Sequence, residues 1–233
     1  MPKLLCLLLV ASLLISPKSN LPDSDRAKAV RLTVWPKLQD ELKAKGFKPN
    51  SPIYIRIFKE ISELEVWVKA GKQYKLFKTY EVCTYSGGLG TKTQSGDGKS
   101  PEGFYIIEPK QLNPVSNYHL AINVGYPNKL EQLKGYTGKE IMVHGNCASI
   151  GCYAMTDPRI DEIFTLVYKA FEAGQQKIDL DIFPFRMDNE HMYKYSRYPS
   201  LAFWKTMKPG YDLFEKTHVP PVVGVKGREY AFN

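Results

Sequence analysis

The sequence predicts a mainly β, α+β fold: a β-sandwich-like domain with helical additions at its N-terminal and C-terminal ends. Short runs rich in β-branched and aromatic residues recur between residues 53 and 144, with no long helix between them. Apolar residues at helical spacing occur before and after that region. The 233 residues, 43% of them hydrophobic, suffice for one sizeable core and would be a tight fit for two domains.

The chain begins with a segment typical of secretion signals. Residues 4–15 form an apolar stretch that matches the hydrophobic region of a signal peptide and is short for a membrane span. Because residues 16–20 contain no clean small-x-small cleavage site, residues 1–19 are expected to be either a signal peptide or a retained N-terminal anchor. A buried helix is the remaining interpretation of this stretch.

Residues 20–49 are predicted to form a helical lead-in. Apolar positions recur there at near-helical spacing, at Val30, Val34, Leu38 and Leu42. Pro36 lies among them and is expected to kink or interrupt the helix, because proline lacks a backbone N–H donor and its ring clashes with the preceding turn.

From residue 53 the period changes to that of β-strands. The predicted strands are residues 53–58, 64–68, 76–82, 104–108, 119–124 and 140–144. The glycine-rich residues 87–103 between them are predicted to be a long turn region. We reject a phosphate-binding loop there, because no glycine-lysine-serine/threonine ending leads into a helix.

The C-terminal third switches to helices. Asp157 is predicted to cap a helix that has Pro158 in its first turn and ends near Gly174. A strand over residues 178–183 follows, then helices over 189–195 and 201–216, with Gly210 a weak point in the second, and an extended segment over 222–232.

The chemistry of the chain is predicted from one short motif. His144 stands eight residues before Cys152, between a strand-like segment and a helix start, and Gly151 permits a tight turn before the cysteine. A cysteine nucleophile needs a nearby base and backbone N–H groups for a developing oxyanion. Three other interpretations stay open: a buried structural thiol, one half of a disulfide, and a zinc site that uses His144, Cys147 and Cys152, although a Cys-x2-Cys pair is absent.

Several motifs, in order along the chain, resemble those of the L,D-transpeptidase catalytic domain family (YkuD type), and more closely its YafK-like branch. They are residues 96–105, 125–128, 144–157, 183–187 and 208–211. Two departures from the wider family concern the nucleophile. The usual serine-histidine-glycine-cysteine core is Ser149-Ile150-Gly151-Cys152 here, and Tyr153 occupies the position where an arginine commonly follows the cysteine.

The resemblance implies a peptidoglycan-modifying enzyme that cuts diaminopimelate-containing stem peptides through a Cys152 thioester and passes the acyl group to an amine. The alternative with the same site is an amidase that detaches an outer-membrane lipoprotein from the wall or trims stem peptides. An alternative of another class is a non-catalytic wall-binding module. The chemistry needs no cofactor or metal. The expected catalytic residues are Cys152, His144, Ser149 and Gly151, and the expected substrate-binding residues are Gly145, Tyr153 and His119.

Charge and cysteine content fit an exported protein. The formal charge is +8, or +6 without the two lysines of residues 1–19, but the lysines are scattered and no nucleic-acid-binding signature is present, so we expect no nucleic-acid partner. An envelope or periplasmic location is expected. Beyond residue 19 there are three cysteines. All three could be free, a Cys83–Cys147 disulfide would leave Cys152 reactive, and a Cys147–Cys152 disulfide would block it.

Overall fold

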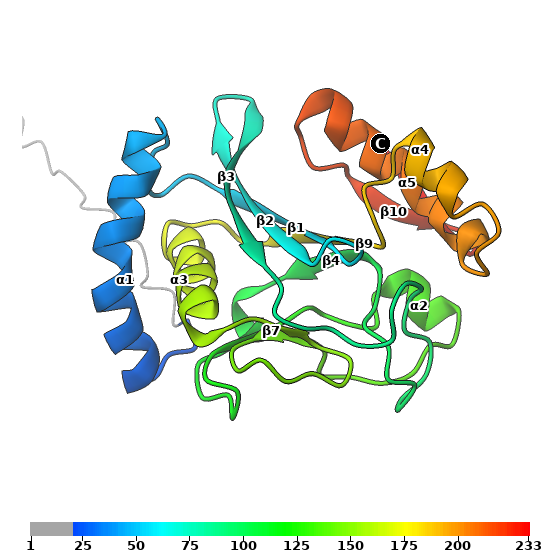
Figure 1. Ribbon diagram of the computed structural model, residues 1–233. Helices are drawn as coiled ribbons and strands as arrows, with labels where there is room; N and C mark the ends of the chain where they lie inside the picture. Colours follow the sequence, from blue (N-terminus) through cyan, green and yellow to red (C-terminus); the bar gives the residue numbers. More distant parts are fainter. Residues whose placement is uncertain (1–20) are drawn as a thin grey trace, which may run out of the picture.

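The computed structural model describes residues 21–233. The expected signal peptide or anchor, residues 1–19, lies outside the described residues. No helix within residues 21–233 is long and apolar enough to cross a membrane. The fold is a mainly β core with helices at both ends, as the sequence predicts (Figure 1).

The larger sheet has five strands in the order β3-β2-β1-β9-β4. β1 pairs with β2 in antiparallel and with β9 in parallel orientation, and β4 closes the other edge antiparallel to β9. The strands are β1 (Ile53–Phe58), β2 (Glu63–Ala70), β3 (Gln73–Glu81), β4 (Gly103–Ile107) and β9 (Ile178–Phe183). Every residue of β1 is buried, because both faces of the sheet are covered.

The smaller sheet carries the predicted nucleophile and has the order β5-β6-β7-β8. Its strands are β5 (Leu112–Asn113), β6 (Ala121–Asn123), β7 (Met142–His144) and β8 (Tyr153–Ala154). β7 and β8 are parallel, with His144 opposite Ala154. These strands are so short that only β6 and β7 were predictable from the sequence pattern.

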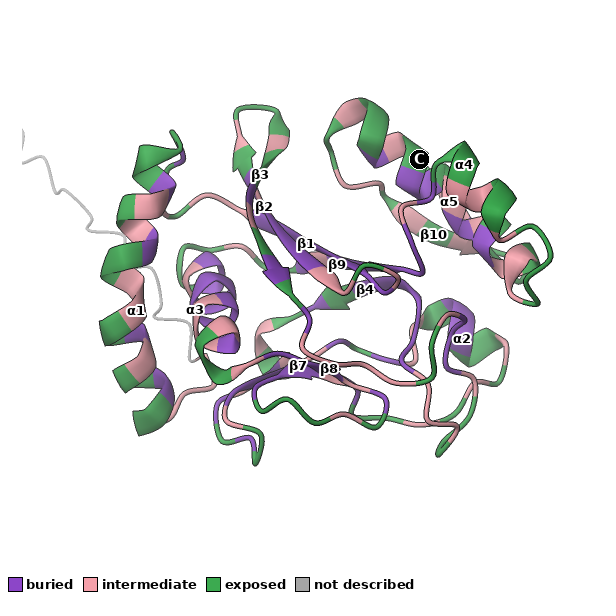
Figure 2. Ribbon diagram, viewed as in Figure 1, coloured by how far each residue is buried: buried purple, intermediate pink, exposed green. Residues whose placement is uncertain are grey.

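Helices α1 (Asp25–Ala44) and α3 (Asp157–Glu172) pack against each other at one side of the core (Figure 1). Buried residues concentrate between these helices and the two sheets, as Figure 2 shows in purple. α1 is not interrupted at Pro36, contrary to expectation. Both Pro36 and Leu32 are exposed, so the Leu32 carbonyl, which loses its helical donor, can reach water instead.

The C-terminal additions cover the opposite face of the larger sheet. They are α4 (Asn189–Lys194), α5 (Leu201–Thr217) and the hairpin of β10 (Val223–Lys226) and β11 (Glu229–Phe232). Together with Phe58 and Phe183 they form a second apolar cluster around the fully buried Trp204.

Two expectations for this region are corrected by the structure. Gly210 does not weaken α5: a Cβ there would lie 2.8 Å from the Phe104 ring and would collide with Phe232, so glycine permits close packing. Residues 222–232 form a hairpin rather than one extended segment, since Gly227 turns the chain at φ +62°.

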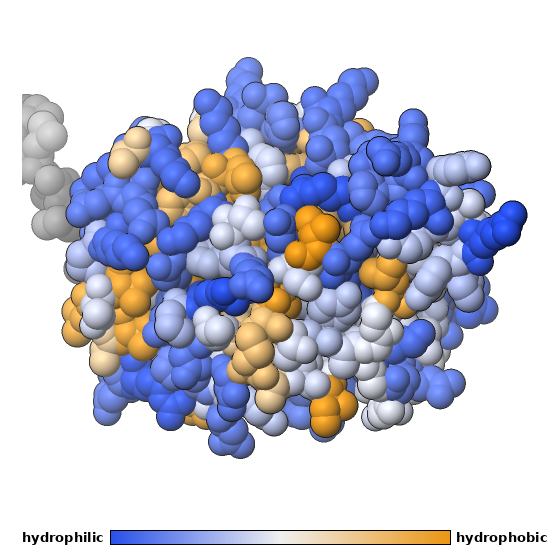
Figure 3. Space-filling view, in the orientation of Figure 1, coloured by the Kyte–Doolittle hydropathy of each residue, from blue (hydrophilic) through white to orange (hydrophobic). Residues whose placement is uncertain are grey.

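Two short helical segments were not predicted: α2 (Lys129–Leu133) and the 3-10 turn Pro109–Gln111. α2 begins with a capping box in which Asn128 and Glu131 bond each other's backbone N–H groups. The surface is mostly hydrophilic in the view of Figure 3, with small separate hydrophobic patches.

Candidate active site

His144 ends β7 and is almost fully buried, at 2% exposure. Its Nδ1 lies 2.5 Å from the Gly145 carbonyl oxygen. Because a carbonyl only accepts hydrogen bonds, Nδ1 must carry the proton, and the neutral ring then keeps its lone pair on Nε2. Burial lowers the pKa of His144, against a smaller raising effect of the Gly145 carbonyl. The residue is thus held as a neutral base.

The Gly145 carbonyl orients the His144 ring. The position of Gly145 leaves no room for a side chain. A Cβ there would lie 2.6 Å from Asp157 Oδ1 and 2.9 Å from His119 Cβ. Its N–H donates to the Leu120 carbonyl at 3.0 Å. Gly145 was expected to bind substrate, but its contacts in the structure are those of a tightly packed backbone that supports His144.

Cys152 immediately precedes β8, the strand that pairs in parallel with β7, which His144 ends. The register pairs His144 with Ala154, two residues after Cys152. The Cys152 Sγ lies 3.8 Å from the Glu140 carbonyl oxygen, and within residues 21–233 no hydrogen bond joins it to His144. The two groups therefore belong to paired segments of the smaller sheet and are not joined by a hydrogen bond in this state.

Burial favours the neutral form of both the thiol and the imidazole. Burial raises the pKa of Cys152, while the Met142 backbone and the Lys92 ammonium lower it by less. Since burial also lowers the pKa of His144, a resting thiolate–imidazolium pair is disfavoured. The arrangement suits proton transfer to His144 at the moment of attack.

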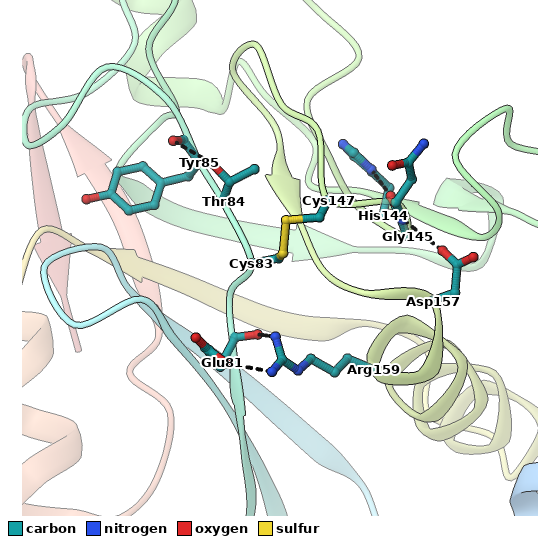
Figure 4. Close-up of a disulfide and its surroundings, with 10 residues drawn as sticks. Glu81, Cys83, Thr84, Tyr85, His144, Gly145, Cys147, Asp157 and Arg159 are labelled. Carbon is teal, nitrogen blue, oxygen red and sulfur yellow. Dashed lines mark hydrogen bonds and ion pairs between the residues drawn. A yellow bond between two sulfur atoms is a disulfide. The ribbon is translucent and has the colours of Figure 1, made fainter.

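A disulfide fixes the turn between the two residues. Cys83, which follows β3, is bonded to Cys147, and Cys152 is the free cysteine of the described chain (Figure 4). The pairing that leaves Cys152 reactive is thus the one present. The His144, Cys147 and Cys152 set lacks one of its three zinc ligands in this state, because the sulfur of Cys147 is bonded to Cys83.

Asp157 holds the start of the same turn. Its Oδ1 accepts the Asn146 N–H at 2.8 Å, and Figure 4 shows it beside His144 and Gly145. Asp157 was expected to cap α3, but the N-cap residue is Thr156. The Asp157 carboxylate instead ties the turn to the first turn of the helix, where a negative charge is favourable.

Serine hydroxyls hold the nucleophile's backbone. Ser149 Oγ donates to the Cys152 carbonyl at 2.7 Å, and Ser100 Oγ donates to the same oxygen at 3.2 Å. The Gly151 N–H donates to Ser86 Oγ at 2.6 Å, with Gly151 at φ +107°. Ser149 was expected to be catalytic, and its observed contact is to the cysteine's own carbonyl. Ser86 and Ser100 were not predicted.

The segment that carries these serines, residues 86–102, is anchored by a buried ion pair. Lys59 and Glu102 are both fully buried and lie 3.0 Å apart. Lys59 Nζ also donates to the Gly90 and Ser100 carbonyls, each at 3.0 Å. The second Glu102 oxygen accepts from Trp204 Nε1 at 2.7 Å, so the anchor reaches the C-terminal helix α5. Sequence reasoning missed this network.

Tyr153 and His119, two expected substrate-binding residues, bond to other parts of the chain. Tyr153 is fully buried, and its hydroxyl donates to the Pro101 carbonyl at 2.6 Å. His119 Nε2 lies 2.6 Å from Asp161 Oδ1. It lines an open hollow of about 630 Å³ whose other walls include Asn146 and Asp157.

Comparison with known proteins shows the family. The family described as YkuD, L,D-transpeptidase catalytic domain, matches residues 54–180, more than half of the chain. The chain belongs to this family. It is also 51% identical, over 183 residues, to the Escherichia coli K12 protein named "Putative L,D-transpeptidase YafK", covering 78% of this chain and 74% of that one.

Solved structures of more distant proteins also align with the chain. The Campylobacter jejuni helical cell shape determining protein Pgp2 is 22% identical with a TM-score of 0.46, over 74% of this chain and 63% of Pgp2. Bd1075 of Bdellovibrio bacteriovorus is 18% identical with a TM-score of 0.41, over 76% of this chain and 78% of that chain. The chain thus spans somewhat less than two thirds of the Pgp2 length.

Proposed function

We propose that this L,D-transpeptidase family member is a cysteine acyltransferase that acts on peptidoglycan stem peptides through a thioester on Cys152. The observation that supports the proposal is a free cysteine directly before the strand that pairs with the strand of a buried histidine, whose Nε2 keeps its lone pair. The substrate class follows from family membership and from the likeness to YafK.

The reaction would proceed in two acyl transfers. His144 Nε2 takes the Cys152 proton while Sγ attacks the carbonyl carbon at the L-centre of diaminopimelate. The carbonyl electrons move to oxygen, then return as the bond to the leaving amine breaks and His144 gives that amine the proton. An acceptor amine from another stem peptide then attacks the thioester and loses a proton to His144, and the C–S bond breaks as His144 passes that proton to the Cys152 sulfur.

The location follows from the same reasoning. Peptidoglycan stem peptides are met outside the cytoplasm, and residues 1–19 have the pattern of a secretion signal or anchor. We propose export to the periplasm of a Gram-negative envelope. A Cys83–Cys147 disulfide is consistent with an oxidising compartment.

The amidase is the second candidate function, and one observation favours it. The turn before Cys152 is open to solvent: Ile150 is 89% exposed. An accessible thioester admits water, which would release stem peptides or a wall-linked lipoprotein instead of joining an amine. An amine acceptor competes only when a site holds it and raises its effective molarity.

The test separates these functions by product. Purified protein is incubated with tetrapeptide muropeptides plus an amine acceptor and, separately, with lipoprotein-linked muropeptides, and products are identified by mass spectrometry. Exchange product in the first mixture alone supports the transferase, whereas release in the second alone overturns it in favour of the amidase. Cys152→Ala serves as the control and should give no product in either mixture. A wild-type protein that binds sacculi but forms no product would be a wall-binding module.

A further inference from the structure

We propose that Ser86 is a catalytic residue whose hydroxyl donates a hydrogen bond to the oxyanion formed during attack by Cys152. This inference rests on the proposed acyl transfer and adds a group to its site. It starts from the N–H of Gly151, an expected catalytic residue, which already donates to Ser86 Oγ at 2.6 Å.

The donors left at the turn are then few. Within residues 21–233 the Cys152 N–H has no acceptor, and the Ser86 hydroxyl, which accepts from Gly151, donates its own hydrogen to no group. A serine hydroxyl has one hydrogen and two lone pairs, so accepting one bond leaves its donor free. Accepting from an N–H also polarises the O–H and strengthens the bond it can donate.

The position of Ser86 is fixed in advance of the reaction. Its N–H donates to Ser100 Oγ at 3.2 Å, and its carbonyl accepts the Ser100 N–H at 3.1 Å. Ser100 is in turn held through its carbonyl by Lys59 of the buried ion pair. After Ser86 the chain turns at Gly87, where a Cβ would lie 2.7 Å from Lys99 Cα. A donor so placed needs little reorganisation when charge develops.

The bond between Cys152 Sγ and the carbonyl carbon forms, the thiol proton moves to His144 Nε2, and the carbonyl π electrons become a lone pair on oxygen. The Ser86 O–H and the Cys152 N–H stabilise this oxygen without transferring a proton to it. When the leaving amine departs with the proton from His144, the carbonyl re-forms and both hydrogen bonds weaken.

The experiment compares two reactions of Cys152 that differ in oxyanion formation. Acylation by an activated ester, p-nitrophenyl acetate, passes through an oxyanion, whereas alkylation by iodoacetamide does not. Ser86→Ala should slow acylation about 100- to 1,000-fold and leave alkylation within about twofold of wild type. Ser86→Thr, which keeps a hydroxyl, should recover most of the acylation rate. Ser95→Ala, an exposed serine of the same segment, should change neither rate.

Two outcomes would overturn the assignment. An equal loss of both reactions in Ser86→Ala would make Ser86 a structural support of the turn, and unchanged acylation would remove it from the site. The ester assay does not depend on peptidoglycan. A wild-type protein that is acylated by the ester but inactive on muropeptides would therefore refute the proposed function while leaving the role of Ser86 intact.

Discussion

The turn that presents Cys152 has two unlike sides. Its inner side faces residues 86–102, where hydroxyls of Ser86 and Ser100 bond the Gly151–Cys152 backbone and a fully buried ion pair anchors the segment. Its outer side is the tip that carries Ile150, 89% exposed. The difference teaches that Cys152 is positioned by a segment that is distant in sequence and anchored by a buried ion pair. The side from which a substrate can approach is left open.

The inner side is held together, but the reason is not that an ion pair is stabilising in itself. Burying both charges costs desolvation, and burial lowers the pKa of Lys59 against the raising effect of Glu102. What the pair provides is complete hydrogen bonding: the Lys59 ammonium bonds two carbonyls and one carboxylate oxygen. Removing one partner would leave the other charged and unpaired.

The largest effect should come from breaking this anchor. Glu102→Ala should lower the free energy of unfolding by about 3–5 kcal/mol, because Lys59 stays buried without its counter-charge. Denaturant unfolding measures the change. Glu172→Ala, which removes a half-exposed surface carboxylate, should cost no more than about 0.5 kcal/mol. A loss as small in Glu102→Ala would show that the inner side is not held by this pair.

Replacing His144, the proposed base, should have the next largest effect. His144→Ala should lower kcat/KM about 100- to 10,000-fold, the usual contribution of a positioned general base. In the wild type, kcat/KM should rise with pH through a pKa below 6.5, since burial lowers the pKa of His144 and only the neutral ring can accept the thiol proton. His191→Ala, remote and bonded to Asp188, should keep the wild-type profile. An acid limb that survives in His144→Ala would assign that ionisation to another group.

The disulfide links the outer tip to the end of β3, and its removal should have a smaller effect. Cys83→Ser combined with Cys147→Ser should destabilise the fold by about 2–4 kcal/mol, because the bond closes a long loop with a sequence separation of 64. Since the serine contacts on the inner side remain, measurable turnover should persist. A double variant that unfolds like wild type, or one that folds but has no activity, would contradict this division of roles.

Local pattern was enough to predict much of the fold. The predicted strands at residues 53–58 and 178–183 have the bounds of β1 and β9, because buried apolar runs flanked by turns carry their own signal. Helix α2 was not predicted, because five residues are too few to show a helical periodicity. Its stability comes from the Asn128–Glu131 capping box. The hairpin at the C-terminus was not predicted, because a single glycine, Gly227, sets its turn.

The residues of the candidate site also differ in whether the sequence predicts them. His144 and Cys152 were predictable because they lie in one motif with a glycine turn between them. Ser86 and Ser100 were not, since the bonds that join them to the motif span 65 and 52 residues of sequence. Glu102 lies within a segment that resembles the family, but nothing in the sequence pairs it with Lys59. Such partners are set by the tertiary fold alone.

Ile150→Ser should have the smallest effect on stability. It is also the sharpest test of the outer side. The side chain is almost fully exposed, so the free energy of unfolding should change by less than about 0.5 kcal/mol. A stem peptide seated over the turn would cover this side chain, and burying about half of it would stabilise the complex by about 1 kcal/mol. Losing that contact should raise KM about fivefold with little change in kcat. Leu32→Ser, at a position that is also largely exposed but lies on α1, should change neither constant. An unchanged KM in Ile150→Ser would place the bound peptide elsewhere and remove the outer tip from substrate recognition.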